Sequence, residues 1–304
     1  MKEKLARFCS SYLGHIALAF VCYCLFLCLI LLSLKAIVPS GGLNQFADGA
    51  AVTLAENAAD ENPDMAGLRH IKLAIVLGEM GLSDKTTKKA VEELPGGISF
   101  SFSPYADNLD NWFAESRKYG HDLLLEIPME PENYPNNDPG PISLLTRYSD
   151  ARNQDMLDEI LRKAHGYSGV TPWMGNAFMS STEHIDAVLK YLRKTELYFL
   201  DRTDQRPASR HQKSIKDIAK NYHLPYVGSR FVLDKTATRE HILGQLDLME
   251  TTARIGDGYA VGFAQAYPVT IDTLKEWERG LGKKNISLVP MSMIAQHVFS
   301  EGGP

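Results

Sequence analysis

The sequence predicts an α/β fold in which parallel strands form a closed or nearly closed barrel. Apolar strand-like runs alternate with helix-like segments from Lys72 onward, and alternation of this kind implies parallel strands joined by right-handed crossovers. Roughly seven or eight strand–helix units fit into about 230 residues, which favours a β/α barrel. A doubly wound open sheet is the alternative arrangement.

The expected elements follow this alternation. The predicted strands are residues 73–77, 98–102, 123–127, 169–171, 197–200, 226–227, 259–263 and 286–289. The predicted helices are residues 85–94, 109–119, 151–164, 182–194, 210–222, 238–254 and 270–281. Two helix starts carry capping residues, Ser83 before the first and Ser180 with Glu183 before the fourth.

A membrane anchor is predicted ahead of this domain. Residues 13–34 form an apolar run of 22 residues, long enough to cross a hydrocarbon core of ~30 Å as a helix. Lys2, Lys4 and Arg7 precede the run, so residues 1–12 are expected in the cytoplasm. The barrel domain is therefore expected outside the cytoplasmic membrane, facing the periplasm or the cell exterior.

Residues 35–69 change in composition to Pro, Ser, Gly, Ala, Asn and acidic residues without a helical or strand period, which predicts a flexible linker. The barrel domain then spans residues 70–304. All four cysteines lie in or beside the anchor, so the domain has no disulfides or thiolate metal ligands. The net charge of −5 argues against a nucleic-acid partner, which would require a basic stripe.

The predicted strand at residues 123–127 leads into a long loop that is rich in proline and acidic residues and contains Glu130 and Asp138. A buried strand that ends in a stiff acidic loop is typical of an active-site rim. A rigid surface loop is the equal alternative. Polar or aromatic residues also stand at the other strand ends, namely Glu79, Glu126, Trp173, Asp201, Arg230 and Gln265.

These segments resemble the divergent polysaccharide deacetylases, relatives of the NodB-type carbohydrate esterases. The loop after the strand reads Pro-Met-Glu-Pro, then Tyr-Pro, then Asn-Asp-Pro-Gly-Pro, and the likeness extends over about residues 70–296. The resemblance implies an irregular (β/α)₇ barrel. It also implies a divalent metal, such as zinc, that would serve the removal of acetyl groups from a glycan.

The chain departs from the family pattern at the positions that would hold this metal. Gly78 and Glu79 stand where the family has two Asp residues, and Glu126, Trp173 and Gln265 each stand in place of a His. Trp cannot ligate a metal, and Gln cannot transfer a proton. We therefore predict no metal site.

The remaining residues receive provisional roles. Glu79 and Asp201 are the candidate catalytic carboxylates. The candidate substrate-binding residues are Glu126, Glu130, Asp138, Trp173, Arg230 and Gln265. Each has a structural alternative: Glu130 as a support of the loop, Trp173 as a packing residue, and Arg230 as half of a salt bridge. Arg202 is expected to pair with Asp201.

The hypothesis drawn from the sequence is a membrane-anchored, deacetylase-like protein of the cell envelope with lost or weakened catalysis and a glycan-binding or regulatory role. One alternative is an active deacetylase that uses Glu79, Glu126 and Asp201 around a metal that prefers oxygen ligands. Another is a structural partner in an envelope protein complex. Fold-level likeness does not decide among them.

Overall fold

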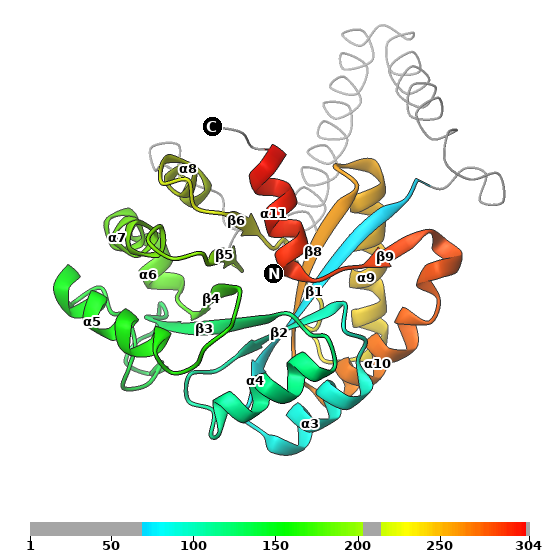
Figure 1. Ribbon diagram of the computed structural model, residues 1–304, viewed down its shortest axis with the longest axis horizontal. Coiled ribbons are helices and arrows are strands. Elements are labelled where there is room, and N and C mark those ends of the chain that lie inside the picture. The colour runs from blue at the N-terminus through cyan, green and yellow to red at the C-terminus, as the bar shows by residue number, and fades with distance from the viewer. Residues whose placement is uncertain (1–68, 203–213, 302–304) are drawn as a thin grey trace, which may run out of the picture. The chain divides into compact units, whose positions relative to one another are not determined.

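The computed structural model describes residues 69–202 and 214–301 (Figure 1). The chain divides into two compact units, residues 1–67 and 68–304, and all described residues belong to the second. The predicted N-terminal segment and anchor, and all of the predicted linker except Arg69, lie outside the described residues. Among the described helices, none is long and apolar enough to cross a membrane.

The described part contains one parallel sheet, in the order β6-β5-β4-β3-β2-β1-β8-β7, with β9 paired to the start of β1. The strands are β1 (Ile71–Met80), β2 (Ile98–Phe102), β3 (Leu123–Met129), β4 (Gly169–Met174), β5 (Tyr198–Asp201), β6 (Tyr226–Gly228), β7 (Phe231–Val232), β8 (Tyr259–Gln265) and β9 (Ile286–Leu288). Helices follow most of these strands, which gives the parallel β/α architecture that the alternation predicts.

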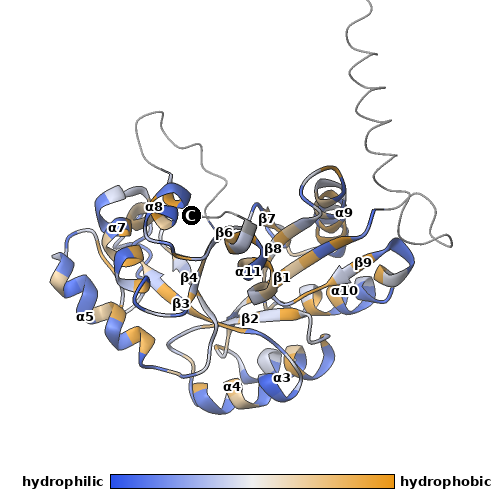
Figure 2. Ribbon diagram, turned by 45° about the horizontal axis from the view of Figure 1, so that its top comes forward, coloured by the Kyte–Doolittle hydropathy of each residue, from blue (hydrophilic) through white to orange (hydrophobic). Residues whose placement is uncertain are grey.

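The described helices form an outer layer around the sheet (Figure 1). They are α3 (Asp84–Glu93), α4 (Leu109–Lys118), α5 (Asp150–Leu161), α6 (Asn176–Ser180), α7 (Thr182–Leu192), α8 (Ile215–Asn221), α9 (Arg239–Ile255), α10 (Pro268–Glu278), the short 3₁₀ turn η2 (Leu281–Lys284) and α11 (Met291–Glu301). Figure 2 shows apolar residues concentrated on the strands and polar residues on the outer faces of the helices.

The side chains on the two faces of each strand pack into two separate apolar cores, because successive side chains on a strand point to opposite faces. In β1, Leu73, Ile75 and Leu77 belong to the core beneath the helices. Ala74 and Val76 belong to a second core inside the barrel. The same alternation puts Glu126 of β3 on the face of Leu124, toward the barrel interior.

Helix α11 covers one end of the barrel. Its Met291 and Ile294 join the interior core, and its first backbone N–H groups bond to Ser99 Oγ and Asp122 Oδ2, at distances of 2.8 Å each. These acceptors lie at or just before the starts of β2 and β3. Helix α11 therefore closes the N-terminal end of the strands and leaves their C-terminal ends available for a site.

The predicted parallel β/α barrel agrees with the structure, but the barrel is not closed. The sheet runs from β6 to β7, and the described residues show no pairing between these two strands. They contain only three and two residues, too few to form a continuous ladder across the gap. The sequence analysis missed β7, α6 and α11.

One predicted helix cap is confirmed and the other is wrong. Ser83 caps α3 and accepts a hydrogen bond from the backbone N–H of Thr86. The residue before α7 is Ser181 rather than Ser180, and Ser181 makes no side-chain cap bond. Ser180 instead ends α6 and donates a hydrogen bond to the carbonyl of Asn176 at 2.7 Å.

Candidate functional site

Glu79 lies at the C-terminal end of β1 in a left-handed backbone conformation, with φ of 57°. Such a φ is uncommon for a residue with a side chain and costs conformational energy. The backbone N–H of Glu79 donates to Glu126 Oε1 at 3.0 Å. This bond ties the end of β1 to β3 and fixes the direction of the Glu79 side chain.

Two neutral donors hold one oxygen of the Glu79 carboxylate. Trp173 Nε1 donates to Glu79 Oε1 at 3.1 Å, and Gln265 Nε2 donates to the same oxygen at 2.9 Å. Three predicted site residues from β1, β4 and β8 are therefore together. No described residue bonds to Glu79 Oε2, and no described Lys or Arg forms an ion pair with Glu79.

Glu126 lies deeper, in the barrel interior, and is fully buried. Its Oε1 accepts hydrogen bonds from Glu79 N and from Ser101 Oγ at 2.9 Å, and lies 3.6 Å from Arg202 Nη1. Burial raises the pKa of the Glu126 carboxyl, while the Arg202 charge acts in the opposite direction. Its Oε2 has no hydrogen-bond partner in the described part of the chain.

The prediction that Arg202 pairs with Asp201 is wrong. The Arg202 guanidinium pairs with Glu126 and lies over the ring of Phe263, 3.9 Å from its centroid. Its side chain is only 16% exposed, and burial lowers the pKa of Arg202 from its usual value. Asp201 accepts a hydrogen bond from the Tyr226 hydroxyl at 2.9 Å, and its charge acts on Arg202 less strongly than those of Glu126 and Glu79.

A pocket of about 420 Å³ opens beside this cluster. The residues that line it come from β4, β8 and the segments that follow the strands: Met174, Asn176, Arg202, Val232, Asp234, Lys235, Ala237, Phe263, Gln265 and Tyr267. Its volume lies within the usual range for small-molecule sites, which is about 300–1,000 Å³. Gln265 connects the pocket directly to the Glu79 carboxylate.

Asp234 supports the wall of this pocket. Its Oδ2 accepts hydrogen bonds from the backbone N–H of Gln265 at 2.8 Å and from Thr270 Oγ1 at 2.9 Å. Burial raises the pKa of Asp234, and its hydrogen bonds oppose that rise. Asp234 thereby holds Gln265, and with it the donor that orients Glu79.

Glu130 and Asp138 have contacts that hold the loop. Glu130 Oε2 accepts hydrogen bonds from the backbone N–H and the hydroxyl of Thr146, at 2.5 and 2.8 Å. Asp138 Oδ1 accepts a bond from Gly140 N at 2.9 Å. Arg230 is exposed and is not among the residues that line the pocket beside Glu79.

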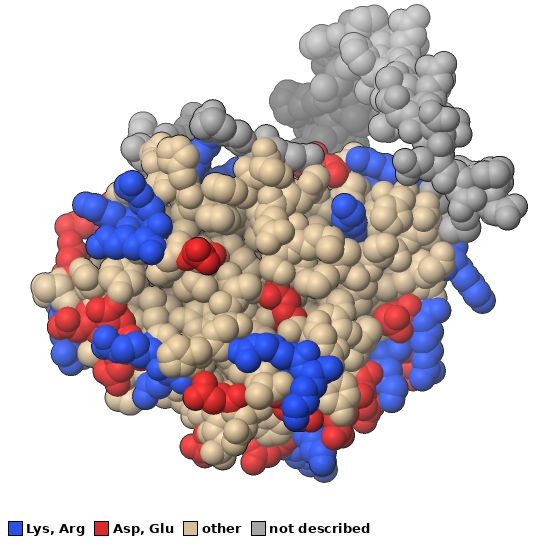
Figure 3. Space-filling view, in the orientation of Figure 1, with Lys and Arg blue, Asp and Glu red and all other residues tan. Residues whose placement is uncertain are grey.

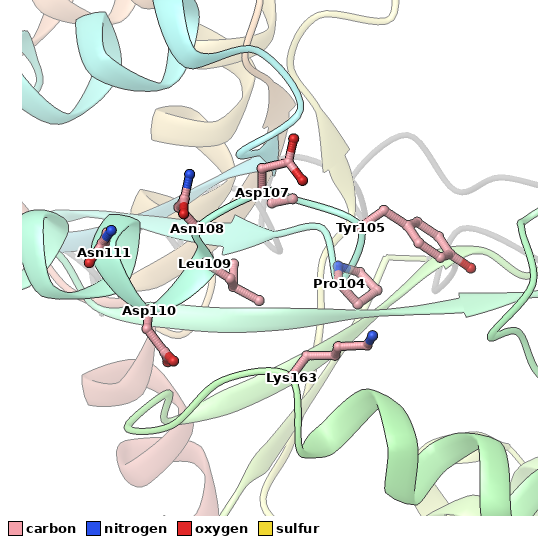
Figure 4. Close-up of a pocket in the computed structure, with 9 residues that line it drawn as sticks. Pro104, Tyr105, Asp107, Asn108, Leu109, Asp110, Asn111 and Lys163 are labelled. Carbon is pink, nitrogen blue, oxygen red and sulfur yellow. The ribbon is translucent and has the colours of Figure 1, made fainter.

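A second pocket, of about 500 Å³, lies beyond the end of β2 (Figure 4). Lys163 and the segment of residues 104–111 line it. Tyr105 connects the two regions, because its ring makes an edge contact with the Trp173 ring, with centroids 6.5 Å apart. The Tyr105 hydroxyl also donates to the carbonyl of Pro139 at 2.8 Å, which fastens the proline-rich loop to this wall.

Comparison with known proteins identifies the family. The profile of the divergent polysaccharide deacetylases matches residues 75–295. The chain belongs to this family.

Two solved structures are similar to this chain. An uncharacterized protein of Agrobacterium tumefaciens C58 is 32% identical, covers 79% of this chain and 94% of its own, and superposes with a TM-score of 0.69. A proposed cellobiose-phosphate cleavage protein of Enterococcus faecalis V583 is 14% identical, with coverage of 74% and 99% and a TM-score of 0.51, and shows the fold alone. A search of curated proteins finds no match.

The described residues do not fit the divalent metal that the deacetylase superfamily uses. A β-carbon at Gly78 would lie 2.2 Å from Phe263 Cζ and 3.0 Å from Glu126 Oε1, so a ligand side chain there would have to displace the Phe263 ring. Within residues 69–202 and 214–301 no three His, Cys, Asp or Glu side chains are placed to hold a metal. The Arg202 guanidinium provides a positive charge beside Glu126 instead.

The sequence analysis missed three participants in the site: Ser101, Phe263 and Tyr105. Ser101 carried a usable signal, because Ser99 and Ser101 alternate with apolar residues in β2 and so share the interior face. The contact between Phe263 and Gly78 depends on the pairing of β1 with β8, and no local pattern predicts that register.

Proposed function

We propose that this deacetylase-family protein binds cell-envelope glycan without hydrolysing it, in a binding or regulatory role. The observation that carries the proposal is the set of partners at Glu79 and Glu126. A metal-dependent hydrolase needs a Lewis acid and groups that move protons. Here one carboxylate is bound by Trp173 and Gln265, and the other by Ser101 and Arg202.

The binding half of the proposal is supported by the pocket and by two aromatic rings near it. Trp173 and Tyr105 meet edge to face next to the Glu79 carboxylate. Aromatic faces pack well on the apolar C–H face of a sugar, while a carboxylate accepts hydrogen bonds from its hydroxyl groups. A pocket of this size with a few convergent polar groups is typical of a small-molecule site.

We also propose that residues 13–34 anchor the protein in the cytoplasmic membrane, with the barrel on the periplasmic or outer side. The apolar length of this segment and the basic residues before it support the proposal. A reporter enzyme fused after Pro304 should then be active outside the cytoplasm. Activity of a cytoplasm-dependent reporter at the same position would contradict this orientation.

The alternative role for the barrel surface is the binding of a partner protein in the envelope.

The test uses the full-length chain with amino-sugar oligomers of four units. We expect calorimetry to detect binding and an acetate assay to detect no release from the acetylated oligomer. Near-stoichiometric zinc in the purified protein, together with acetate release that Glu79→Gln abolishes, would overturn the proposal in favour of an active enzyme with a rebuilt carboxylate site. Absence of binding by every oligomer would leave the scaffold role.

A further inference from the structure

We propose that the pocket beside Glu79 prefers a positively charged amino sugar, the deacetylated form of the glycan unit, over its acetylated form. The inference rests on the proposed glycan-binding function and adds the chemical class of ligand. It would make the protein a reader of deacetylated glycan on a fold whose relatives are named for removing the acetyl group.

The main observation is a carboxylate that is held rigidly and has no cationic partner. Glu79 is partly buried, its backbone is tied to Glu126, and its Oε1 is held by two neutral N–H donors. Its Oε2 receives no hydrogen bond from the described residues, and none of their Lys or Arg side chains forms an ion pair with it. Glu79 Oε2 is not among the buried unpaired atoms of the described residues, so this oxygen is open to solvent. A ligand cation can therefore reach it without breaking an ion pair.

The one arginine that lines the pocket does not fill this role. The charge of Arg202 is directed to Glu126, and its guanidinium packs on the Phe263 ring. Four carboxylates, those of Glu79, Glu126, Asp201 and Asp234, lie close enough to raise its pKa, against the larger opposing effect of burial. The other cation among the residues that line the pocket, Lys235, is exposed to solvent, so water and salt screen its charge.

The negative charges of Glu79 and Asp234 also act on Tyr267. Tyr267 lines the pocket and is 40% exposed. Burial raises the pKa of its phenol, and the charges of Glu79 and Asp234 raise it further. Across the face drawn in Figure 3, acidic and basic side chains are interspersed, so a long-range field of one sign does not mask the local effect of Glu79.

The nitrogen groups of the two ligand forms differ in charge and in their number of N–H donors, and both differences affect binding to the Glu79 carboxylate. An ammonium group offers three N–H donors and a positive charge, whereas an acetamide offers one neutral N–H. A hydrogen bond to a charged group is roughly twice as strong as one between neutral groups. The acetamide would also bring a carbonyl oxygen toward carboxylates that cannot donate to it. We therefore expect a preference of about tenfold for the amine.

The experiment is calorimetric titration of the full-length chain with three oligomers of four units: glucosamine, N-acetylglucosamine and glucose. We expect the glucosamine oligomer to bind about tenfold more tightly than the other two. Glu79→Gln retains the acceptor oxygen for Trp173 and Gln265 but removes the charge, so it should reduce this preference to less than about threefold. Glu92→Gln makes the same chemical change on the outer helix α3, where Glu92 pairs with Lys88, and should leave the preference unchanged.

The possible failures are distinguishable. If the acetylated oligomer binds as tightly as the amine or more tightly, the inference is wrong while glycan binding stands. If wild type and Glu92→Gln lose the preference equally in 0.5 M salt and Glu79→Gln keeps it at low salt, general charge attraction explains it and the inference is again wrong. If no oligomer binds, or acetate is released, the proposed function itself fails. The comparison among ligands needs no variant, so a poorly folded Glu79→Gln would not weaken it.

Discussion

Two carboxylates in this barrel accept a hydrogen bond from a tryptophan, and their surroundings differ in one respect. Glu250 of α9 accepts a bond from Trp277 Nε1 at 2.9 Å and also pairs with Lys284, whose Nζ lies 3.0 Å from each of its oxygens. Glu79 accepts a bond from Trp173 Nε1 at 3.1 Å, but its second donor is the neutral amide of Gln265. Both glutamates are held in place, but of the two only Glu250 forms an ion pair with a described residue.

The difference separates a structural contact from the contact that we propose for ligand binding. The Glu250 cluster joins α9, α10 and η2 in the outer layer, where a matched charge stabilises the packing of these elements. The Glu79 cluster lies at the C-terminal ends of the strands, next to a pocket, where active sites of β/α barrels are found. A charge left without a partner there adds little to folding and is available to a ligand.

The largest expected effect comes from removing the partner of a third carboxylate, Glu126, which is fully buried. Arg202→Met should lower the free energy of unfolding by about 3–5 kcal/mol, the usual cost of leaving a buried charge without its partner. Urea unfolding followed by circular dichroism measures this. The double variant with Glu126→Gln should regain most of the loss. Equal stability of Arg202→Met and wild type would show that Arg202 does not stabilise Glu126.

The pH dependence of stability tests the same carboxylate. Burial raises the pKa of Glu126, so the folded state binds this proton more tightly than the unfolded state. The resulting stability is present below the ordinary carboxyl pKa of about 4.3 and is lost as pH rises through the raised pKa of the folded state. Wild type should therefore lose stability relative to Glu126→Gln as pH rises, by at most about 1.4 kcal/mol per pH unit.

Other groups contribute to the pH profile of both proteins. Burial raises the pKa of Asp234, which acts in the same direction as Glu126, and burial lowers the pKa of His121, which acts in the opposite direction. Subtracting the Glu126→Gln profile from that of wild type removes these shared terms. A difference that is flat between pH 4 and pH 8 would contradict the raised pKa of Glu126.

A smaller effect is expected at the matched carboxylate of the outer layer. Glu250→Gln retains an acceptor for Trp277 but loses the charge pair with Lys284, whose side chain is 43% exposed. Because solvent screens an ion pair with such an exposed partner, the loss should be about 1–2 kcal/mol. Thermal melts of the variant and wild type measure it. No change in melting temperature would mean that the Lys284 charge contributes nothing to stability. Glu250 would then not be an example of a carboxylate whose ion pair stabilises the fold.

The sequence predicted much of the fold because its signals are local. The strand at 98–102 was predicted with its observed bounds, and β3 begins where predicted but extends two residues further, through Pro128 and Met129. The contacts of Glu130 could also be anticipated as a loop support, since Thr146 lies only 16 residues away. Helix α11 was missed because it follows Pro290 directly. Its apolar residues pack into the core at the end of the barrel and do not form the single apolar stripe that marks a surface helix.

The site was predicted as a set of residues but not as a set of contacts. Glu79, Trp173 and Gln265 were all singled out, yet they are separated by 94 and 186 residues and meet only through the pairing of distant strands. Arg202 was assigned to its neighbour Asp201 because adjacency is visible in a sequence. Its observed partner, Glu126, lies on β3, and neither the barrel geometry nor the Phe263 ring that supports the guanidinium can be read from local pattern.

The smallest expected effect on stability is at Glu79. Glu79→Gln preserves the shape of the side chain and one acceptor oxygen for Trp173 and Gln265. It removes a charge that forms no ion pair with a described Lys or Arg and acts on Arg202 only at longer range. Its free energy of unfolding should stay within about 0.5 kcal/mol of the wild-type value, or rise slightly. Urea unfolding of Glu79→Gln beside Glu250→Gln makes the comparison with the same chemical change at both positions. A loss at Glu79 equal to that at Glu250 would mean that the Glu79 charge is already matched within the protein, and the carboxylate would then have no charge left to offer a ligand.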